Sequence, residues 1–128
     1  MELRTCISCP LHMQTSVLGE PKPMNAVSGE GPVPCEVMLV GEAPGALENL
    51  LARPFVGRSG ARLTALLSLS PWTRNQVYID NVVKHQPPKN RKPKAAEIKA
   101  CAHWLEEAIA RVQPKVMLKL PFGAMPIT

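Results

Sequence analysis

Apolar residues along this chain are spaced in two ways, and each spacing predicts a different kind of element. Short runs rich in apolar and β-branched residues, at 36–40, 77–83 and 116–120, predict β-strands. Between them, residues 61–69 and 98–112 repeat apolar side chains at the spacing of one helix face. The chain therefore alternates strand, helix, strand, helix, strand.

This alternation predicts an α/β fold with a mainly parallel sheet, because a strand that continues through a helix returns parallel to its predecessor. Residues 1–35 lack periodicity and contain several prolines and glycines, so we expect a loop-rich arm ahead of a core at 36–128. A chain of 128 residues predicts a single domain over 1–128. Few residues follow the last predicted strand, so we expect the α/β core to be partial and incomplete at the C-terminus.

The charge balance is modestly basic. Fifteen lysines and arginines against ten acidic residues give a net charge of +5, which suits a polyanionic partner without identifying one. The first residues do not resemble a secretion signal, and no apolar run is long enough for a membrane span. We therefore expect a cytoplasmic protein with no membrane association, in which cysteines favour metal binding or reactivity over disulfides.

A glycine-rich segment follows the first predicted strand directly. The sequence Gly41-Glu42-Ala43-Pro44-Gly45 stands where open α/β sheets bind ligands, outside the carboxyl ends of their strands. Glycines let a substrate approach the backbone closely, and proline stiffens the turn. A tight connection from strand to helix, without a ligand, explains the same residues equally well.

Two further residues have the chemistry of a base-binding pocket. Phe55 lies in the loop Arg-Pro-Phe-Val-Gly-Arg-Ser-Gly (53–60), where an aromatic ring can stack on a flat base. Asn81 ends the second predicted strand, and its amide offers both a donor and an acceptor to the edge of a pyrimidine. Packing in the core for Phe55, and capping of a turn for Asn81, are the alternatives without a ligand.

The cysteines and one histidine suggest a metal centre. Cys6 and Cys9 form a Cys-x2-Cys pair in the arm, Cys101 lies on the long predicted helix, and His85 opens a basic loop. Cys35, beside the first strand, is either a buried thiol or a substitute ligand. Spacing alone does not separate zinc from an iron–sulfur cluster.

The basic loop at 84–94 contains five cations and no acidic residue. Such a segment grips phosphates in some proteins and is only a solvated face in many others. Its position directly after Asn81 favours a role with nucleic acid. The cations are Lys84, Lys89, Arg91, Lys92 and Lys94.

Taken in order, these segments resemble the iron–sulfur (family 4) uracil-DNA glycosylases. The resemblance rests on Gly-Glu-Ala-Pro-Gly (41–45), Arg-Pro-Phe-Val-Gly-Arg-Ser-Gly (53–60) and Asn-Val-Val-Lys (81–84) followed by Pro-Pro-Lys-Asn-Arg-Lys-Pro (87–93), with Cys101 beyond them. It covers nearly the whole chain. It implies a Rossmann-like three-layer α/β/α sandwich of the uracil-DNA glycosylase type.

The resemblance also implies an activity and roles for particular residues. Enzymes of this family hydrolyse the N-glycosidic bond of a uracil flipped out of DNA, as the first step of base excision repair. Phe55 would stack on the uracil, Asn81 would read its polar edge, and Glu42 would be the catalytic residue that places the attacking water. Gly41, Ala43, Pro44 and Gly45 would line the pocket, and Lys84, Lys89 and Arg91 would contact DNA.

The implied cofactor is a [4Fe-4S] cluster, with zinc as the alternative. Cys6, Cys9 and Cys101 match cysteines of the family, whereas His85 stands where the family has another cysteine. Our first expectation is therefore a Cys3His ligand set, the second is Cys35 in place of His85, and the third is a lost or labile cluster.

One departure affects the expected activity. Family members continue into a further unit that ends in a histidine-containing loop serving the leaving group, and His12, His85 and His103 match no such motif here. The resemblance as a whole still implies a monomeric uracil-DNA glycosylase that acts on uracil-containing DNA. The alternative is a catalytically impaired nucleic-acid-binding module that retains the fold and the metal cluster.

Overall fold

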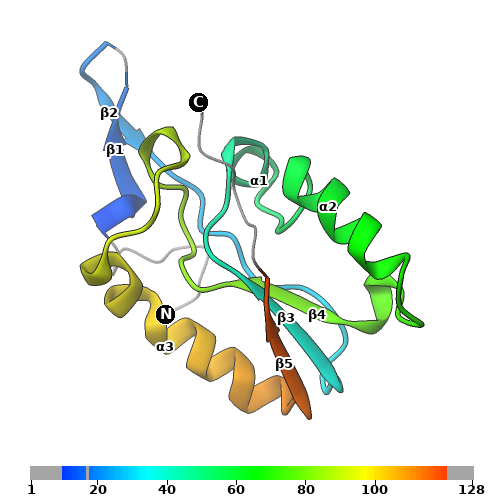
Figure 1. Cartoon of the computed structure of the whole chain (residues 1–128). Helices are drawn as coiled ribbons and strands as arrows, with labels where there is room; N and C mark the ends of the chain where they lie inside the picture. The colour runs from blue at the N-terminus through cyan, green and yellow to red at the C-terminus, as the bar shows by residue number, and fades with distance from the viewer. Residues whose placement is uncertain (1–9, 17, 121–128) are drawn as a thin grey trace.

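The computed structural model describes residues 10–16 and 18–120. Three strands and two long helices form the core, close to the predicted positions (Figure 1). The strands are β3 (Val37–Gly41), β4 (Tyr78–Asn81) and β5 (Val116–Lys119), and the helices are α2 (Arg58–Leu67) and α3 (Ala95–Val112). The remaining elements are the short strands β1 (Met13–Thr15) and β2 (Pro21–Pro23), helix α1 (Ala46–Leu51), and the 3-10 helices η2 (Pro10–His12), η3 (Arg74–Gln76) and η4 (Pro88–Asn90).

The core sheet is parallel, as predicted. Its strand order is β4-β3-β5, with β3 at the centre and both neighbours running in the same direction. The register pairs Gly41 with Asn81, so the last residues of β3 and β4 lie side by side. The two polar segments that follow these strands therefore begin at the same edge of the sheet.

Helices cover both faces of the sheet, which confirms the α/β fold. Side chains of a strand alternate between the two faces. Val37 and Leu39 accordingly pack with Leu63 of α2, while Met38 and Val40 pack with the α3 side. Figure 1 shows α2 and α3 on opposite sides of the strands. None of the described helices is both long enough and apolar enough to cross a membrane.

Helix α3 ends at the predicted residue, Val112, but begins at Ala95, three residues before the predicted start. At its start, the carboxylate of Glu97 accepts a hydrogen bond from the backbone N–H of Lys94 at 2.8 Å, which satisfies a donor that the helix leaves free. At its end, Gln113 adopts a left-handed conformation and donates its N–H to Ile109 O, just before Pro114. The buried residues Ala108 and Val112 pack against the sheet, with Met38 and Val40 of β3.

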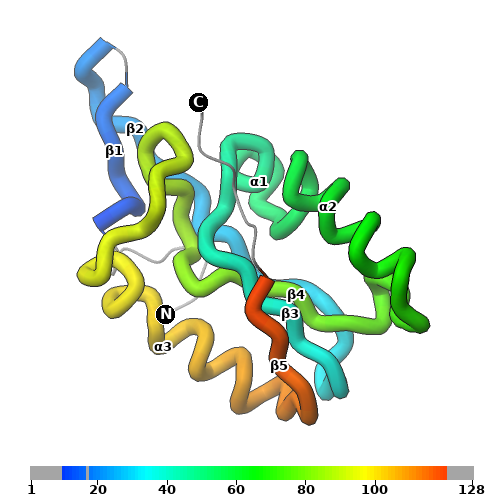
Figure 2. Tube along the Cα trace, in the orientation of Figure 1, coloured from blue at the N-terminus to red at the C-terminus, as the bar shows by residue number. Residues whose placement is uncertain are grey.

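Two features were not predicted. Residues 10–35, expected as irregular loop, contain η2 and an antiparallel hairpin that pairs Gln14 with Lys22; Figure 2 shows this hairpin standing apart from the core sheet. Helix α1 occupies the segment between the two glycine-containing motifs, where no helix was expected. Both are too short to show a clear hydrophobic period.

The two sides of the sheet differ. Beside β4, Glu30 exchanges backbone hydrogen bonds of 2.9 Å with Ile79, and so occupies the outer edge of that strand. At β5, which is the last strand on the other side of the described sheet, all four residues are exposed.

Candidate nucleobase site

The candidate site lies where β3 and β4 end. The ladder between these strands continues past Gly41 and Asn81, because Val82 donates its N–H to Gly41 O at 2.9 Å and Val83 donates to Glu42 O at 3.0 Å. The segment 41–45 and the segment 81–85 therefore run together beyond the sheet. The sequence predicted this arrangement from the positions of the two motifs at strand ends.

Phe55 joins them from a distant part of the chain. A Cβ atom placed on Gly41 would lie 2.5 Å from Cζ of Phe55 and 2.6 Å from Oδ1 of Asn81. Both side chains therefore occupy the space that a side chain at position 41 would need. Gly41 is required here by close approach, and the predicted meeting of an aromatic ring with a strand-end amide is present.

The cluster formed by Gly41, Phe55 and Asn81 is closed to solvent in this structure. Phe55 is 1% exposed and packs in the apolar core with Leu63 and Ile79, and Asn81 is 2% exposed. The sequence hypothesis placed these two side chains across an open slot, so the burial of both is a departure from it. Oδ1 of Asn81 is nonetheless without a hydrogen-bond partner among the described residues. A buried acceptor left in this state is costly, and a ligand that donates a hydrogen bond to it would remove that cost.

A buried ion pair holds the backbone of Asn81 on both sides. Nζ of Lys84 lies 2.6 Å from Oδ1 of Asp80 and donates a second hydrogen bond, also 2.6 Å, to Asn81 O. The carboxylate of Asp80 in turn accepts the N–H of Asn81 at 2.7 Å. Burial raises the pKa of the Asp80 carboxyl, and the ammonium of Lys84 opposes this shift.

This geometry corrects the predicted role of Lys84. Its side chain is 1% exposed, and its ammonium group is bound within the protein, so it cannot reach a phosphate at the surface. In the sequence Lys84 is the first cation of a basic loop, and nothing there indicates that its side chain points into the protein interior. In this structure Lys84 holds the backbone of Asn81 and is not accessible to DNA.

The other two predicted DNA contacts differ in accessibility. Lys89 is exposed in η4. Arg91 is partly exposed and forms two hydrogen bonds with the carboxylate of Glu97, at 2.9 and 2.8 Å, which lower the pKa of Glu97 below its usual value. A role for both in phosphate binding stays a prediction. Of the two, Lys89 is the more exposed and is therefore better placed to contact DNA.

The remaining residues of the glycine-rich segment surround the same strand end. Glu42, the predicted catalytic residue, is half-buried, whereas Ala43, Pro44 and Gly45 are buried. The backbone N–H of Gly45 donates to Oε1 of Glu48 at 2.9 Å, so this segment is held in one conformation. The assignment of these residues to substrate binding and catalysis stays a prediction.

The sequence gave no indication of the role of Glu48, which the structure places at the centre of the site's scaffold. Its side chain is buried, and Oε2 accepts the backbone N–H groups of Val56 and Gly57 at 2.9 and 2.7 Å. Through its other oxygen it binds Gly45, so one carboxylate joins the two glycine-containing motifs. Glu48 is the third residue of α1, a position from which a glutamate side chain bonds back to the backbone, but α1 itself was not predicted.

Part of the predicted metal centre lies within the described residues. Cys6 and Cys9 lie outside them. Cys101 is fully buried on α3 and packs in one apolar cluster with Leu11 of the arm. His85 is 1% exposed, and its Nδ1 has no hydrogen-bond partner within the described part of the chain. No group of three or more metal-binding side chains forms among residues 10–16 and 18–120.

Comparison with known proteins places the chain in a family. The sequence model of the Uracil DNA glycosylase superfamily matches residues 28–125, which include every element of the candidate site. The chain belongs to the uracil DNA glycosylase superfamily. It is 42% identical to a type-4 uracil-DNA glycosylase of Thermotoga maritima over 123 residues, which are 96% of this chain and 60% of that protein.

Other members of the superfamily are similar over comparable lengths. A type-4 uracil-DNA glycosylase of Pyrobaculum aerophilum is 42% identical over 118 residues, covering 92% of this chain and 56% of that enzyme. A type-5 uracil-DNA glycosylase of Thermus thermophilus is 34% identical over 119 residues, covering 82% and 53% respectively. The chain thus spans between half and two thirds of the length of these relatives.

Proposed function

We propose that this protein is a uracil-DNA glycosylase, which hydrolyses the N-glycosidic bond of a uracil flipped out of DNA. The observation that carries this proposal is the unpartnered Oδ1 of Asn81, buried beside the ring of Phe55 and against Gly41. An amide oxygen accepts a hydrogen bond, and the N3–H of uracil is a donor, whereas N3 of cytosine is an acceptor. A uracil seated here would donate its N3–H to Oδ1 of Asn81, which has no hydrogen-bond partner among the described residues.

The surrounding residues suit the rest of the reaction. Phe55 supplies a flat apolar surface for stacking, and the backbone N–H groups of Glu42 and Ala43 are proposed to stabilise the oxygen of the departing uracil anion. Glu42, half-buried at the end of β3, is the proposed residue that positions water for attack on the sugar. Release then leaves free uracil and an abasic site in DNA, the expected first product of base excision repair.

The proposal requires the site to open. Since Phe55 and Asn81 are both nearly inaccessible, a base can enter only if these two side chains move apart. A non-catalytic nucleic-acid-binding module is the second candidate. The closed cluster favours it.

We also propose a [4Fe-4S] cluster bound by Cys6, Cys9, His85 and Cys101. Two observations support the fit: Nδ1 of His85 is buried without a partner, and Leu11, two residues after Cys9 in sequence, packs with Cys101. Such a cluster would fasten the N-terminal arm to α3, and imidazole is a known replacement for a cysteine ligand of iron. Zinc bound by the same residues is the alternative.

Uracil release from single-stranded and duplex DNA tests the activity. We expect the wild-type chain to release free uracil and Asn81→Ala to lose this activity. Asn75→Ala is the matched control, because it changes an exposed asparagine that lies before β4 and not at the strand end that carries Asn81. Asn81→Asp should retain the shape but replace the amide N–H donor by a second acceptor, which disfavours O4 of uracil and suits the N4 amino group of cytosine, so the preference for uracil should be lost. Binding of DNA that weakens with salt, without release of uracil, would instead establish the binding module.

The cofactor is tested separately by composition and colour. Purification without oxygen should give a brown protein that contains iron and acid-labile sulfide. A colourless protein with one zinc ion per chain would show that the alternative holds.

A further inference from the structure

The backbone at Phe55 adopts a conformation that its side chain does not favour. Its φ is +53°, in the left-handed region that glycine tolerates and bulky residues avoid. Such a residue keeps this conformation only where its surroundings hold it, and residues of this kind concentrate at functional sites. The turn formed by residues 54–57, called the Phe55 turn below, therefore needs an external support.

Arg74 supplies the support on the carbonyl side. From η3, just before β4, its guanidinium donates one hydrogen bond to Phe55 O at 2.6 Å and another to Pro54 O at 2.7 Å. The two bonds use the fork of the guanidinium, a geometry that lysine cannot reproduce. Gly60 completes this side, since a Cβ there would lie 2.3 Å from Phe55 O.

Glu48 supplies the support on the amide side. Its Oε2 accepts the N–H groups of Val56 and Gly57, the two residues after Phe55. A cation thus binds the carbonyl groups at the start of the Phe55 turn, and an anion binds the amides at its end. Each charge is matched to the sign of the backbone dipole that it meets.

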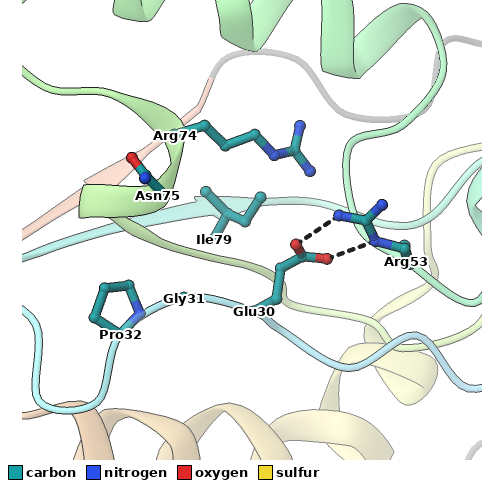
Figure 3. Close-up of a pocket in the computed structure, with 7 residues that line it drawn as sticks. All are labelled: Glu30, Gly31, Pro32, Arg53, Arg74, Asn75 and Ile79. Carbon is teal, nitrogen blue, oxygen red and sulfur yellow. Dashed lines mark hydrogen bonds and ion pairs between the residues drawn. The ribbon is translucent and has the colours of Figure 1, made fainter.

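The guanidinium of Arg74 is bound by carbonyl groups of the protein, although its side chain reaches a cavity. Its side chain borders a cavity of about 530 Å³ that lies beside β4 and includes Ile79 and the ion pair of Arg53 with Glu30 (Figure 3). In Figure 3 the guanidinium of Arg74 extends above Ile79, toward the loop that carries Arg53. Burial lowers the pKa of this guanidinium, and the carbonyl groups replace part of its lost hydration.

We infer that Arg74 and Glu48 are positioning residues, which together hold the Phe55 turn so that its ring meets Gly41 and Asn81. They act through the backbone of the turn. The expected effect of these residues on catalysis rests on the proposed function, whereas their role in holding the Phe55 turn does not. Neither residue was indicated by a sequence motif.

The ring of Phe55 can be observed directly. The chain has two phenylalanines, so selective labelling of phenylalanine gives two sets of ring signals, and the contact of one set with the Cα protons of Gly41 identifies Phe55. We expect Arg74→Lys and Glu48→Gln each to shift these signals and to weaken that contact. Arg53→Gln is the matched control. It removes a guanidinium that borders the same cavity but donates its hydrogen bonds to Glu30 and not to the Phe55 turn.

The kinetic readout separates positioning from general damage. Base stacking on an aromatic ring is worth about 5- to 150-fold in binding, so a displaced Phe55 should raise KM for uracil-containing DNA within that range. A variant that merely contains less folded protein would lower kcat and leave KM unchanged. Arg53→Gln should change neither constant.

The outcomes distinguish this inference from the proposed function. If the wild-type chain releases no uracil but both variants displace the Phe55 signals, the positioning roles stand and the glycosylase proposal fails. If Arg74→Lys and Glu48→Gln are folded and leave the Phe55–Gly41 contact intact, the inference is overturned, whatever the activity. Arg74→Gln provides a further variant if either of these does not fold.

Discussion

Replacing Lys84 by methionine tests whether this residue supports the site or contacts DNA. Methionine retains an unbranched apolar side chain but removes the ammonium, which leaves the Asp80 carboxylate buried without its cation. Removal of one partner from a buried ion pair costs about 3–5 kcal/mol, because the remaining charge is uncompensated. Natural domains have about 5–15 kcal/mol of stability, so Lys84→Met should lose a large part of the total.

Urea unfolding followed by circular dichroism measures this loss. With a slope of about 1–3 kcal/mol per molar urea, the expected change moves the midpoint downward by at least about 1 M. Lys89→Met, at an exposed position of the same loop, should move it little. The double variant Asp80→Asn with Lys84→Met should recover most of the loss, since neither residue then carries a charge.

The loss should also depend on pH. Burial already raises the pKa of Asp80, and without Lys84 it rises further. An acid whose pKa is higher in the folded state destabilises the fold as pH increases from its unfolded value, about 3.9, through its folded value. The difference between wild type and Lys84→Met should therefore be small near pH 4 and largest at neutral pH.

DNA binding completes the test. A residue that contacts phosphate changes the dependence of log affinity on log salt by about one unit, and Lys89→Met is expected to do so. Lys84→Met should leave that slope unchanged at temperatures where it is folded. A stability loss below about 1 kcal/mol combined with a reduced salt slope would refute the buried role and restore Lys84 as a DNA contact.

Three further predictions concern other parts of the site. Gly41→Ala should expel the ring of Phe55, because the new methyl group would lie 2.5 Å from it, and a loss of the ring contact by NMR together with lost uracil binding checks this. Arg91→Ala should cost at most about 1 kcal/mol at pH 7, and the difference should vanish in urea titrations as pH falls through the depressed pKa of Glu97, whose charged form Arg91 stabilises. Cys101→Ser should lower bound iron and weaken the visible absorption; unchanged iron content would exclude this cysteine as a ligand.

The sequence predicted the parts of the fold that depend on long hydrophobic patterns. The runs at 36–40, 77–83 and 116–120 each contain the observed strand, apart from one residue at the end of β3, because short runs rich in apolar and β-branched residues favour strands even where, as in β5, the side chains are exposed. Helix α1 and the β1–β2 hairpin were missed. Six residues are too few to show a helical period, and the three-residue strand β2 contains two prolines, which argue against a strand.

The site was predictable where chemistry followed strand ends, and not where it depended on side chains that bind backbone. Gly41 and Asn81 are adjacent because parallel strands bring their carboxyl ends to one edge. The burial of Lys84 was hidden, since a sequence shows the charge of a lysine but not the direction of its side chain. Arg74 and Glu48 were missed for a related reason. They bind backbone carbonyl and amide groups, which every residue type carries, so no sequence motif marks the residues they bind.

The unequal edges of the sheet limit how copies of this protein can associate. Unpaired strand edges can recruit other strands, but Glu30 already occupies the flank of β4, which leaves β5 as the open flank of the described sheet. Two molecules joined through their β5 strands would consume both open flanks at once. In the described sheet a further strand could therefore add beside β5, whereas beside β4 the bridge between Glu30 and Ile79 stands in its way.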